Sequence, residues 1–266
     1  MDAALRPLIV FVHVPKTAGT TIRWMLERRL RGAWAETAEE AAALVASAAK
    51  TDVDFIAGHV PYGVHSHGPR PPIYVTMLRE PISRVASHYW FVRADRQHYL
   101  YAAIAERRLT LREYAEAGCT LSAEIENGQV WLFSERARRL GCADREALEE
   151  ARAVLRERFS VVGTTERFRE SVAVLQAVLG IRPAVQTPRN VGPPRPPLDD
   201  ETRSALARRN ELDRELHAEA NRLLDETIGR LGARFDRELR RLRRLDAAHR
   251  AVHRVSGRAA RLVFER

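Results

Sequence analysis

The stretch LIVFVHVPKTAGTTIRWML, residues 8–26, decides the fold that we expect for this chain. It begins with an apolar run rich in valine and isoleucine, at residues 8–14, which is typical of a buried strand. A compact turn with one glycine follows, and residues 20–30 then have the apolar spacing of a helix. A strand, a loop and a helix in this order form the first part of a βαβ unit, which belongs to a parallel sheet.

The same alternation continues along the chain. Short apolar runs predict strands at residues 53–57, 73–78 and 160–163. We expect helices at residues 37–49, 82–93, 111–117, 123–140, 145–158 and 167–179. Six of the thirteen prolines then lie between Pro183 and Pro197, which predicts an extended surface loop before a helical pattern resumes at Leu198. The sequence therefore indicates the α/β class, with a central parallel sheet flanked by helices and a C-terminal helical extension.

Length and composition exclude several classes of protein. The chain has 266 residues, of which 45% are hydrophobic and 30% charged, so it is neither disordered nor of low complexity and is long enough for a substantial core. It has no run of 18 apolar residues, which argues against a transmembrane span, and its first residues pass directly into a strand, which argues against a secretory signal. Cys119 and Cys142 are too few for a disulfide framework. We therefore expect a reducing compartment, the cytoplasm.

Positive charge is concentrated at the C-terminus. The net charge is +9, and residues 230–266 alone contain twelve arginines and four acids. We divide the chain into a main domain at residues 1–232 and an Arg-rich tail at residues 233–266, which we expect to be helical as far as Ser256 and Gly257. Three interpretations of the tail stay open: a solvated helix that packs by its leucine face, an amphipathic helix on an anionic membrane surface, or a guide for an acidic substrate.

The turn inside the first stretch has the parts of an anion-binding site. The start of a helix presents unpaired backbone N–H groups and the positive end of the helix dipole. Lys16 adds an ammonium, Gly19 allows a close approach of the backbone, and Thr20 and Thr21 add hydroxyl donors. Only Lys16 and Lys50 among the forty-four basic residues are lysines, which favours a specific role for Lys16 over an ordinary turn with a solvated lysine. A Walker A loop is excluded, because its lysine follows the second glycine, whereas Lys16 precedes Gly19.

A second cation follows the strand expected at residues 73–78. Ligands of open α/β sheets bind outside the carboxyl ends of the strands, so Arg79 is placed to meet an anion. Ser87 lies two helical turns into the helix that follows. A surface ion pair between Arg79 and Glu80 is the alternative interpretation.

A histidine emerges at the same edge, because the strand expected at residues 53–57 is followed by Gly58 and His59. Imidazole is the side chain best suited to accept a proton near neutral pH, so His59 is a candidate general base. A metal cluster of His59, His65 and His67 is the alternative, but the loop between them lacks a cysteine or carboxylate partner. We expect His65 and His67 to be exposed loop residues.

The segment HVPKTAGTT, residues 13–21, resembles the 5′-phosphosulfate-binding loop of the carbohydrate sulfotransferases that use 3′-phosphoadenosine 5′-phosphosulfate (PAPS). This family includes the heparan sulfate 2-O-sulfotransferases and soluble bacterial members. The resemblance implies a P-loop-like three-layer fold and Arg79 and Ser87 as the 3′-phosphate site. It also implies His59 as catalytic base, since a Gly-His at this strand end carries the base in that family. The donor loop that it implies consists of Lys16, Thr17, Ala18, Gly19, Thr20 and Thr21.

Less specific segments extend the resemblance over residues 8–230: FSVVGTTERFRESVAVL, ENGQVWLFS and RNELDREL. The resemblance also implies that Asn190 and Arg195, in the segment NVGPPRP, correspond to contacts of a late loop with the donor. The implied reaction is the transfer of a sulfuryl group from PAPS to a hydroxyl of a carbohydrate or related acceptor, such as a glycan or glycolipid. Lys16 and His59 would be the catalytic residues.

Two other functions stay open. An atypical nucleotide-dependent kinase would normally need Mg²⁺ held by an acid at a strand end near the loop. No aspartate stands there, so we expect no metal. A basic module that binds anionic polymers without catalysis would account for the tail but would leave Lys16, His59 and Arg79 without a common purpose. We expect no nucleic-acid partner, and a peripheral contact of the tail with membranes stays open.

Overall fold

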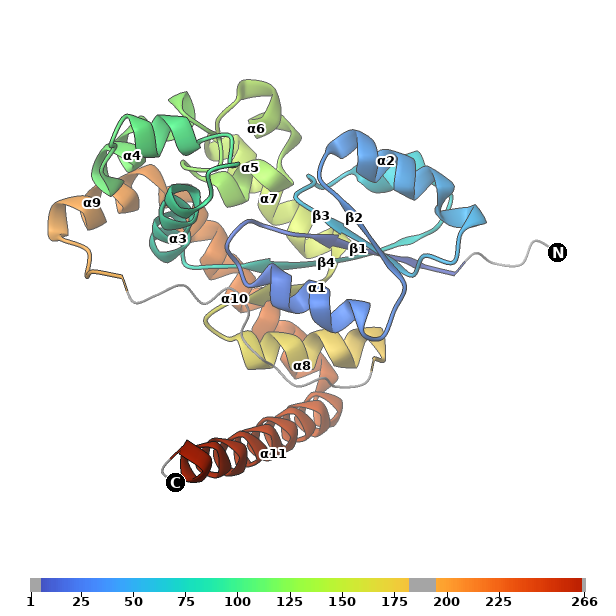
Figure 1. Cartoon of the computed structure of the whole chain (residues 1–266). Helices are drawn as coiled ribbons and strands as arrows, with labels where there is room; N and C mark the ends of the chain where they lie inside the picture. The colour runs from blue at the N-terminus through green and yellow to red at the C-terminus, as the bar shows by residue number, and fades with distance from the viewer. Residues whose placement is uncertain (1–5, 182–194, 265–266) are drawn as a thin grey trace.

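The computed structural model describes residues 6–181 and 195–264, and the side chains of these residues as far as His249. A five-stranded sheet lies at its centre in the order β2-β3-β1-β4-β5, and all neighbouring strands are parallel. The strands are β1 (Leu8–Val12), β2 (Gly32–Ala35), β3 (Phe55–Gly58), β4 (Pro72–Leu78) and β5 (Phe159–Thr164). The expected α/β class with a parallel sheet is confirmed (Figure 1).

Helices cover both faces of this sheet (Figure 1). Successive side chains of a strand point to opposite faces, so Val10 and Val12 pack into one core cluster while Ile9 and Phe11 pack into the other. The first face is covered by α2 (Ala38–Ser47), α5 (Gly128–Phe133), α7 (Arg145–Arg158) and α10 (Glu211–Leu231). The second face is covered by α1 (Gly19–Glu27), α8 (Phe168–Leu179) and the start of α11 (Ala233–Phe264). The result is three layers, helix on sheet on helix.

A further group of helices lies beyond the carboxyl ends of the strands (Figure 1). Here α3 (Pro81–Ala94), α4 (Leu111–Ala117) and α9 (Asp200–Arg209) share a separate buried cluster that includes Val85, Tyr89 and Tyr114. The remaining helical elements are α6 (Glu135–Leu140), η1 (Ala48–Lys50), η2 (Val64–His67), η3 (Ala102–Glu106) and η4 (Gly118–Thr120). The group around α3 therefore stands next to the edge of the sheet at which the predicted site residues emerge.

Two elements differ from the sequence prediction. The sequence does not predict β2, because GAWA is short and only Ala35 is buried, yet this segment pairs with β3. The helix expected at residues 123–140 is divided into α5 and α6 by Ser134, whose backbone is extended. The Ser134 hydroxyl accepts a hydrogen bond from the Ala137 N–H at 3.0 Å and donates one to Glu150 at 2.5 Å. A serine with these partners starts a new helix instead of continuing the previous one.

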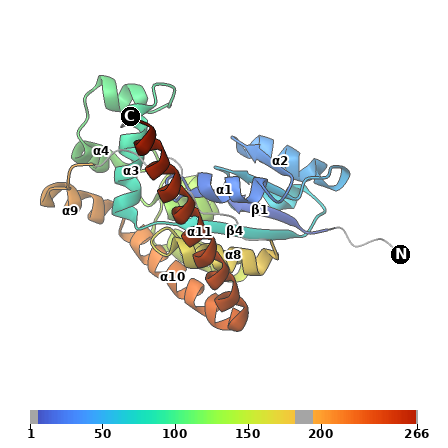
Figure 2. The same ribbon diagram turned by 60° about the horizontal axis from the view of Figure 1, so that its bottom comes forward.

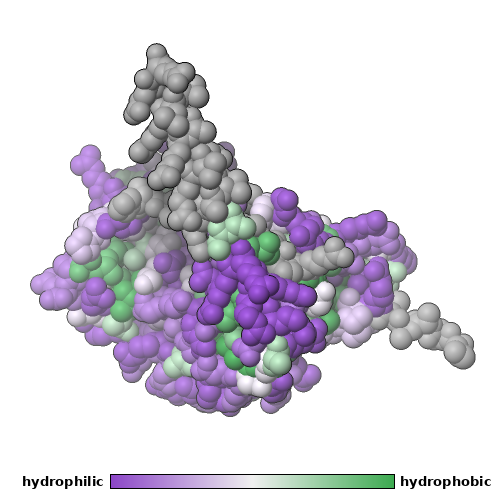
Figure 3. Space-filling view, turned by 90° about the horizontal axis from the view of Figure 1, so that it is seen from below, coloured by the Kyte–Doolittle hydropathy of each residue, from purple (hydrophilic) through white to green (hydrophobic). Residues whose placement is uncertain are grey.

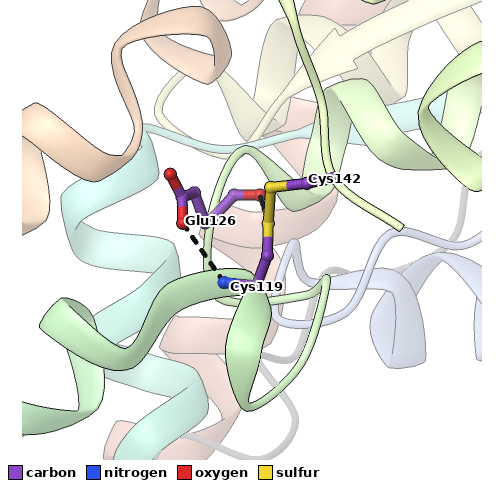
Figure 4. Close-up of side chains that lie close together, drawn as sticks. All are labelled: Cys119, Glu126 and Cys142. Atoms are coloured by element: carbon purple, nitrogen blue, oxygen red, sulfur yellow. Dashed lines mark hydrogen bonds between the residues drawn. A yellow bond between two sulfur atoms is a disulfide. The ribbon is translucent and has the colours of Figure 1, made fainter. Parts of the chain in front are cut away.

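The two cysteines form a disulfide bond, which joins η4 to the segment after α6 (Figure 4). The Glu126 carboxylate lies beside it and accepts a hydrogen bond from the Cys119 N–H at 3.2 Å. The number of cysteines is too small for a disulfide framework, but it is sufficient for one crosslink between Cys119 and Cys142. The inference of a reducing compartment from that number is therefore not supported.

The tail forms the long helix α11, which follows α10 after a sharp turn at Gly232 (Figure 2). Its leucine face packs inward, because Phe235, Leu239 and Leu242 are buried with residues of α8 and the sheet. The helix reaches Phe264, so the expected end near Gly257 is wrong. Figure 3 views this side of the molecule and shows a largely hydrophilic described surface interrupted by apolar spots. None of the described helices has the length and apolarity needed to cross a bilayer.

Candidate functional site

The loop between β1 and α1 lies in the middle of the sheet, between the ends of two neighbouring strands. The last residue of β1, Val12, pairs with Gly58 of β3 on one side and with Thr76 of β4 on the other. The segments after these three strands therefore emerge at one edge. The loop itself, the segment with His59 and the segment with Arg79 meet there, as the sequence predicts.

The loop is held in a tight conformation. Lys16 and Ala18 both have positive φ angles, of 68° and 63°, which is uncommon for residues with a side chain. The Thr17 hydroxyl donates a hydrogen bond to the Val14 carbonyl at 2.8 Å, and the Thr21 N–H donates one to the Ala18 carbonyl at 3.0 Å. Thr17 is completely buried, so its hydroxyl stabilises the loop. Left-handed residues in a loop before a helix can turn neighbouring N–H groups toward one point, which suits an anion.

Gly19 is required by a residue that the sequence reasoning did not select, His13. A Cβ atom at Gly19 would lie 1.8 Å from Cδ2 of His13, so only glycine lets the start of α1 pack on this ring. The His13 ring also contacts the rings of Phe11, Trp34 and His59, at centroid distances of 5.5, 5.5 and 4.7 Å. Burial lowers the pKa of His13 to about 3, so this ring stays neutral. In the sequence, His13 directly follows the apolar run of β1, and this position at the end of a strand could have identified it as a candidate site residue.

Lys16 lies beside the second predicted cation. Its Nζ atom is 3.9 Å from the ring centroid of Phe91 in α3, and its carbonyl oxygen accepts a hydrogen bond from Nη1 of Arg79 at 3.0 Å. Burial lowers the pKa of Lys16 to about 8, and the charge of Arg79 contributes to the shift. Burial also lowers the pKa of Arg79, against the opposing effect of Glu166 and Glu80. Two crowded, partly desolvated cations favour the binding of a ligand with several negative charges.

The backbone of Arg79 is fixed by the fully buried Gln129 of α5. The Arg79 N–H donates a hydrogen bond to Oε1 of Gln129, and Nε2 of Gln129 donates one to the Arg79 carbonyl, both at 2.9 Å. Glu80 does not form the alternative ion pair with Arg79, because its carboxylate accepts hydrogen bonds from the N–H groups of Ile82 and Ser83 and so caps α3. Arg79 is therefore oriented by neutral partners, and its charge is available to a ligand.

A buried network behind Gln129 connects two segments that are distant in the chain. They are ENGQV, residues 126–130, which leads into α5, and RNELD, residues 209–213, which leads into α10. The Asp213 carboxylate accepts hydrogen bonds from the N–H groups of Gln129 at 3.1 Å and Val130 at 2.8 Å, and it lies 3.6 Å from the Arg84 guanidinium. The Asn127 side chain accepts a hydrogen bond from the Asp213 N–H at 3.0 Å. These two segments, which sequence reasoning singled out without a role, position the backbone that carries Arg79.

Ser87 lies in α3, half-buried, one helical turn before Phe91. Residues four apart in a helix share one face. Because Phe91 contacts the Lys16 ammonium, Ser87 lies on the face of α3 that carries this contact. The structure thus brings Lys16, Arg79 and the Ser87 face of α3 to one side of the loop.

His59 lies on the other side of the loop, directly after β3. Its ring packs against His13 and, at a centroid distance of 5.3 Å, against Trp34, while it remains accessible to solvent. The surrounding protein lowers the pKa of His59 by desolvation, the charges of Glu124 and Glu36 oppose this, and Lys16 adds to it. A neutral imidazole near a bound anion can accept a proton from a hydroxyl group.

His65 and His67, which would form a metal site together with His59, do not lie around it. Nδ1 of His65 is 2.9 Å from the Tyr74 hydroxyl, so His65 is half-buried and hydrogen-bonded, whereas the sequence predicts an exposed residue. His67 is exposed as expected. Asn190 lies outside the described residues, and the guanidinium of Arg195 stacks on Trp90 of α3 at 5.1 Å from the ring centroid.

Two curated proteins resemble this chain in sequence. Heparan sulfate 2-O-sulfotransferase hst-2 of Caenorhabditis elegans is 27% identical over 133 residues, and heparan sulfate 2-O-sulfotransferase 1 of Gallus gallus is 29% identical over 140 residues. The chain is related to the sulfotransferases. Each alignment covers 47% of this chain and 40% or 37% of the relative, so the chain spans about two fifths of the sulfotransferases it matches. No family model matches the chain.

Proposed function

We propose that this protein transfers a sulfuryl group from PAPS to a hydroxyl group of a carbohydrate acceptor. The observation that carries the proposal is the hydrogen bond from Arg79 to the Lys16 carbonyl, which holds two cations of neighbouring strand ends together. A donor with phosphate groups at its 3′ and 5′ positions needs a cation for each of them, and Lys16 and Arg79 follow neighbouring strands at one edge of the sheet. The relationship to two carbohydrate sulfotransferases supports the same reaction.

Each side of the donor would have its own partners. Lys16 and the backbone N–H groups of Thr17, Ala18, Gly19 and Thr20 would bind the 5′-phosphosulfate, whereas the Thr21 N–H donates to the Ala18 carbonyl. The guanidinium of Arg79 and the hydroxyl of Ser87 would bind the 3′-phosphate, which fixes the direction in which the sulfur atom faces. The exposed hydroxyl of Thr20 adds a donor that the buried Thr17 cannot supply.

The transfer is an in-line displacement at sulfur. The acceptor oxygen forms a bond to sulfur while the bond from sulfur to the phosphate oxygen breaks, and the product nucleotide leaves with the electron pair. His59 takes the proton of the attacking hydroxyl, for which its lowered pKa keeps it neutral. The Lys16 ammonium stabilises the negative charge that develops on the departing phosphate.

Titration calorimetry and a transfer assay test this function. We expect 3′-phosphoadenosine 5′-phosphate to bind the wild-type protein, and labelled sulfate from PAPS to reach a glycan or glycolipid acceptor. Replacement of His59 by Ala should abolish transfer and leave nucleotide binding intact. Stabilisation by ATP with Mg²⁺, without binding of 3′-phosphoadenosine 5′-phosphate, would favour the kinase instead. Binding of anionic polymers alone, with a steep dependence on salt, would favour the basic module.

Three wider expectations belong to the same proposal. The sulfotransferase domain comprises residues 1–232, followed by the tail at residues 233–266. The protein is a soluble enzyme of the bacterial type, and its Arg-rich helix makes peripheral contact with membranes. Fractionation of cells that produce the protein, with and without high salt, tests the last two expectations.

A further inference from the structure

Exposed aromatic rings gather in one place near the loop. Among the described residues, three large apolar side chains are exposed: Phe91 at 41%, Tyr99 at 67% and Leu140 at 58%. His98 connects the first two, with ring centroids 5.8 Å from Phe91 and 4.7 Å from Tyr99. We call Phe91, His98 and Tyr99 the aromatic row. Exposed apolar surface is costly, so a cluster of it next to a candidate site suggests a ligand.

The aromatic row is held in position by its own contacts. The Tyr99 hydroxyl is 2.9 Å from Oγ of Ser122, and the Leu100 N–H donates a hydrogen bond to Nδ1 of His98 at 3.2 Å. The rings of His98 and Tyr99 are nearly parallel, at an interplanar angle of 25°. Phe91 belongs to α3, which is anchored in a buried cluster. A flat surface that is ordered before binding loses little entropy when a ligand stacks on it.

The row begins at Lys16 and extends on the side of His59. The Lys16 ammonium lies 3.9 Å from the Phe91 ring centroid, at the place where the transferred group would be held. At the other end, burial lowers the pKa of His98, and the charges of His88, Glu124 and His59 also act on it. The Glu124 carboxylate is 3.0 Å from Nε2 of His88, so it lies on the same side. The row therefore adjoins the position of the donor at one end, and at the other end it adjoins His88 and Glu124, whose charge also acts on His59.

We propose that the aromatic row is the acceptor subsite and stacks a pyranose ring of the β-gluco type. Such a ring carries axial C–H groups on both faces, and these positively polarised hydrogens fit the negative face of an aromatic ring. The inference rests on the proposed function, since it assigns a position for the sugar whose hydroxyl attacks.

The donor's adenine is the competing occupant of these rings. The observations favour the sugar, because Phe91 contacts Lys16 at the 5′ end of the donor, and the ring centroid of His98 lies 5.5 Å from that of His88, which pairs with Glu124. An adenine lies beyond the ribose, away from the group that is transferred. The nucleotide affinity of variants in the aromatic row distinguishes adenine from the sugar.

Binding of two hexasaccharides tests the inference, with the protein saturated by 3′-phosphoadenosine 5′-phosphate. The probes are cellohexaose, which is uncharged, and an unsulfated heparosan hexasaccharide, which carries uronic acids. We expect the wild-type protein to bind at least one of them, and Tyr99→Ala and Phe91→Ala to raise its Kd about tenfold. Tyr99→Phe keeps the ring, and Leu140→Ala removes exposed apolar surface elsewhere, so both should stay within about twofold of wild type.

The possible results distinguish failure of the acceptor subsite from failure of the proposed sulfotransferase function. Nucleotide binding without hexasaccharide binding, or hexasaccharide binding that Tyr99→Ala and Phe91→Ala leave unchanged, overturns the acceptor subsite. Loss of affinity for the nucleotide in these variants, with sugar binding intact, assigns the rings to adenine. Failure of the wild-type protein to bind 3′-phosphoadenosine 5′-phosphate refutes the proposed function itself. Circular dichroism of each variant excludes misfolding as the cause.

Discussion

The guanidinium of Arg79 donates a hydrogen bond to the backbone carbonyl of Lys16 at 3.0 Å, although the two residues follow different strands. The bond joins the end of β4 to the loop after β1. A ligand that binds both cations thus meets one rigid unit instead of two independent side chains. This contact makes the positions of Lys16 and Arg79 interdependent, and it leads to specific expectations for variants of each.

Replacement of Lys16 by Ala removes the ammonium that would stabilise the departing phosphate. We expect kcat for sulfate transfer to fall on the order of 10²–10³-fold, as for the loss of a preorganised donor elsewhere. Transfer from labelled PAPS measures this, and Lys50→Ala, the change of the other lysine, is the matched control. Near-normal turnover of Lys16→Ala would remove this residue from the mechanism.

Replacement of Arg79 by Ala should mainly weaken donor binding. The loss of one charge-assisted hydrogen bond corresponds to about 10–100-fold in the Kd of 3′-phosphoadenosine 5′-phosphate. Gln129→Leu should weaken binding in the same direction, because it releases both backbone groups of Arg79. Calorimetry measures both affinities, with Arg93→Ala as control. Unchanged affinity of Arg79→Ala would contradict the 3′-phosphate site.

The pH dependence of kcat/KM follows from two lowered pKa values. His59 must be neutral to accept a proton, and its pKa is below 6.5, so the rate rises with pH through that lowered value and is constant near neutral pH. Lys16 must be charged to bind the donor, and its pKa is about 8, so kcat/KM falls above about pH 8. A wild-type profile without the decline at high pH would contradict the role of Lys16.

The disulfide should contribute to stability. It closes a segment with a sequence separation of 23 residues, for which the restriction of the unfolded chain is worth about 3 kcal/mol. Urea unfolding of the Cys119→Ser, Cys142→Ser double variant should show this decrease in the free energy of unfolding. Addition of a reductant should destabilise the wild-type protein and have no effect on the double variant. Equal stability of all samples would indicate that the bond does not form.

Two truncations separate the roles of the tail. Removal of residues 250–266 retains Phe235, Leu239 and Leu242, so we expect little change in the melting temperature. Removal of residues 233–266 takes these buried side chains away, at a cost of about 1.5–3 kcal/mol each. Sedimentation with anionic vesicles then tests membrane contact. Equal binding of vesicles by the full chain and by residues 1–249 would place any contact outside the last helical turns.

Much of this arrangement can be predicted from the sequence, for a physical reason. Parallel strands buried on both faces are continuous apolar runs, and their carboxyl ends must meet at one edge, so the proximity of Lys16, His59 and Arg79 follows from the strand pattern. Contacts between distant segments leave no such pattern. The hydrogen bonds between Gln129 and Arg79, and between Asp213 and Gln129, depend on how α5 and α10 pack. The strand β2 is likewise defined by its pairing with β3.

The same limit applies to the candidate site in detail. The anion-binding loop is encoded locally, by residues that are consecutive in the chain. The role of His13 becomes visible only through its contact with Gly19, and the aromatic row only through the packing of α3 over the loop. Neither contact can be predicted from neighbouring residues in the sequence. The disulfide likewise depends on the folded distance between η4 and the end of α6, which two isolated cysteines do not reveal.

The buried carboxylate of Asp213 has a consequence for biosynthesis. A nascent chain that has emerged only as far as α9 already contains the phosphate-binding loop, the candidate base and Arg79, but it lacks the partner that ties α5 in place. The N–H groups of Gln129 and Val130 then lack their acceptor, so this network does not hold the segment that orients Arg79. The positioning of Arg79 therefore depends on a helix that is synthesised after all the candidate site residues.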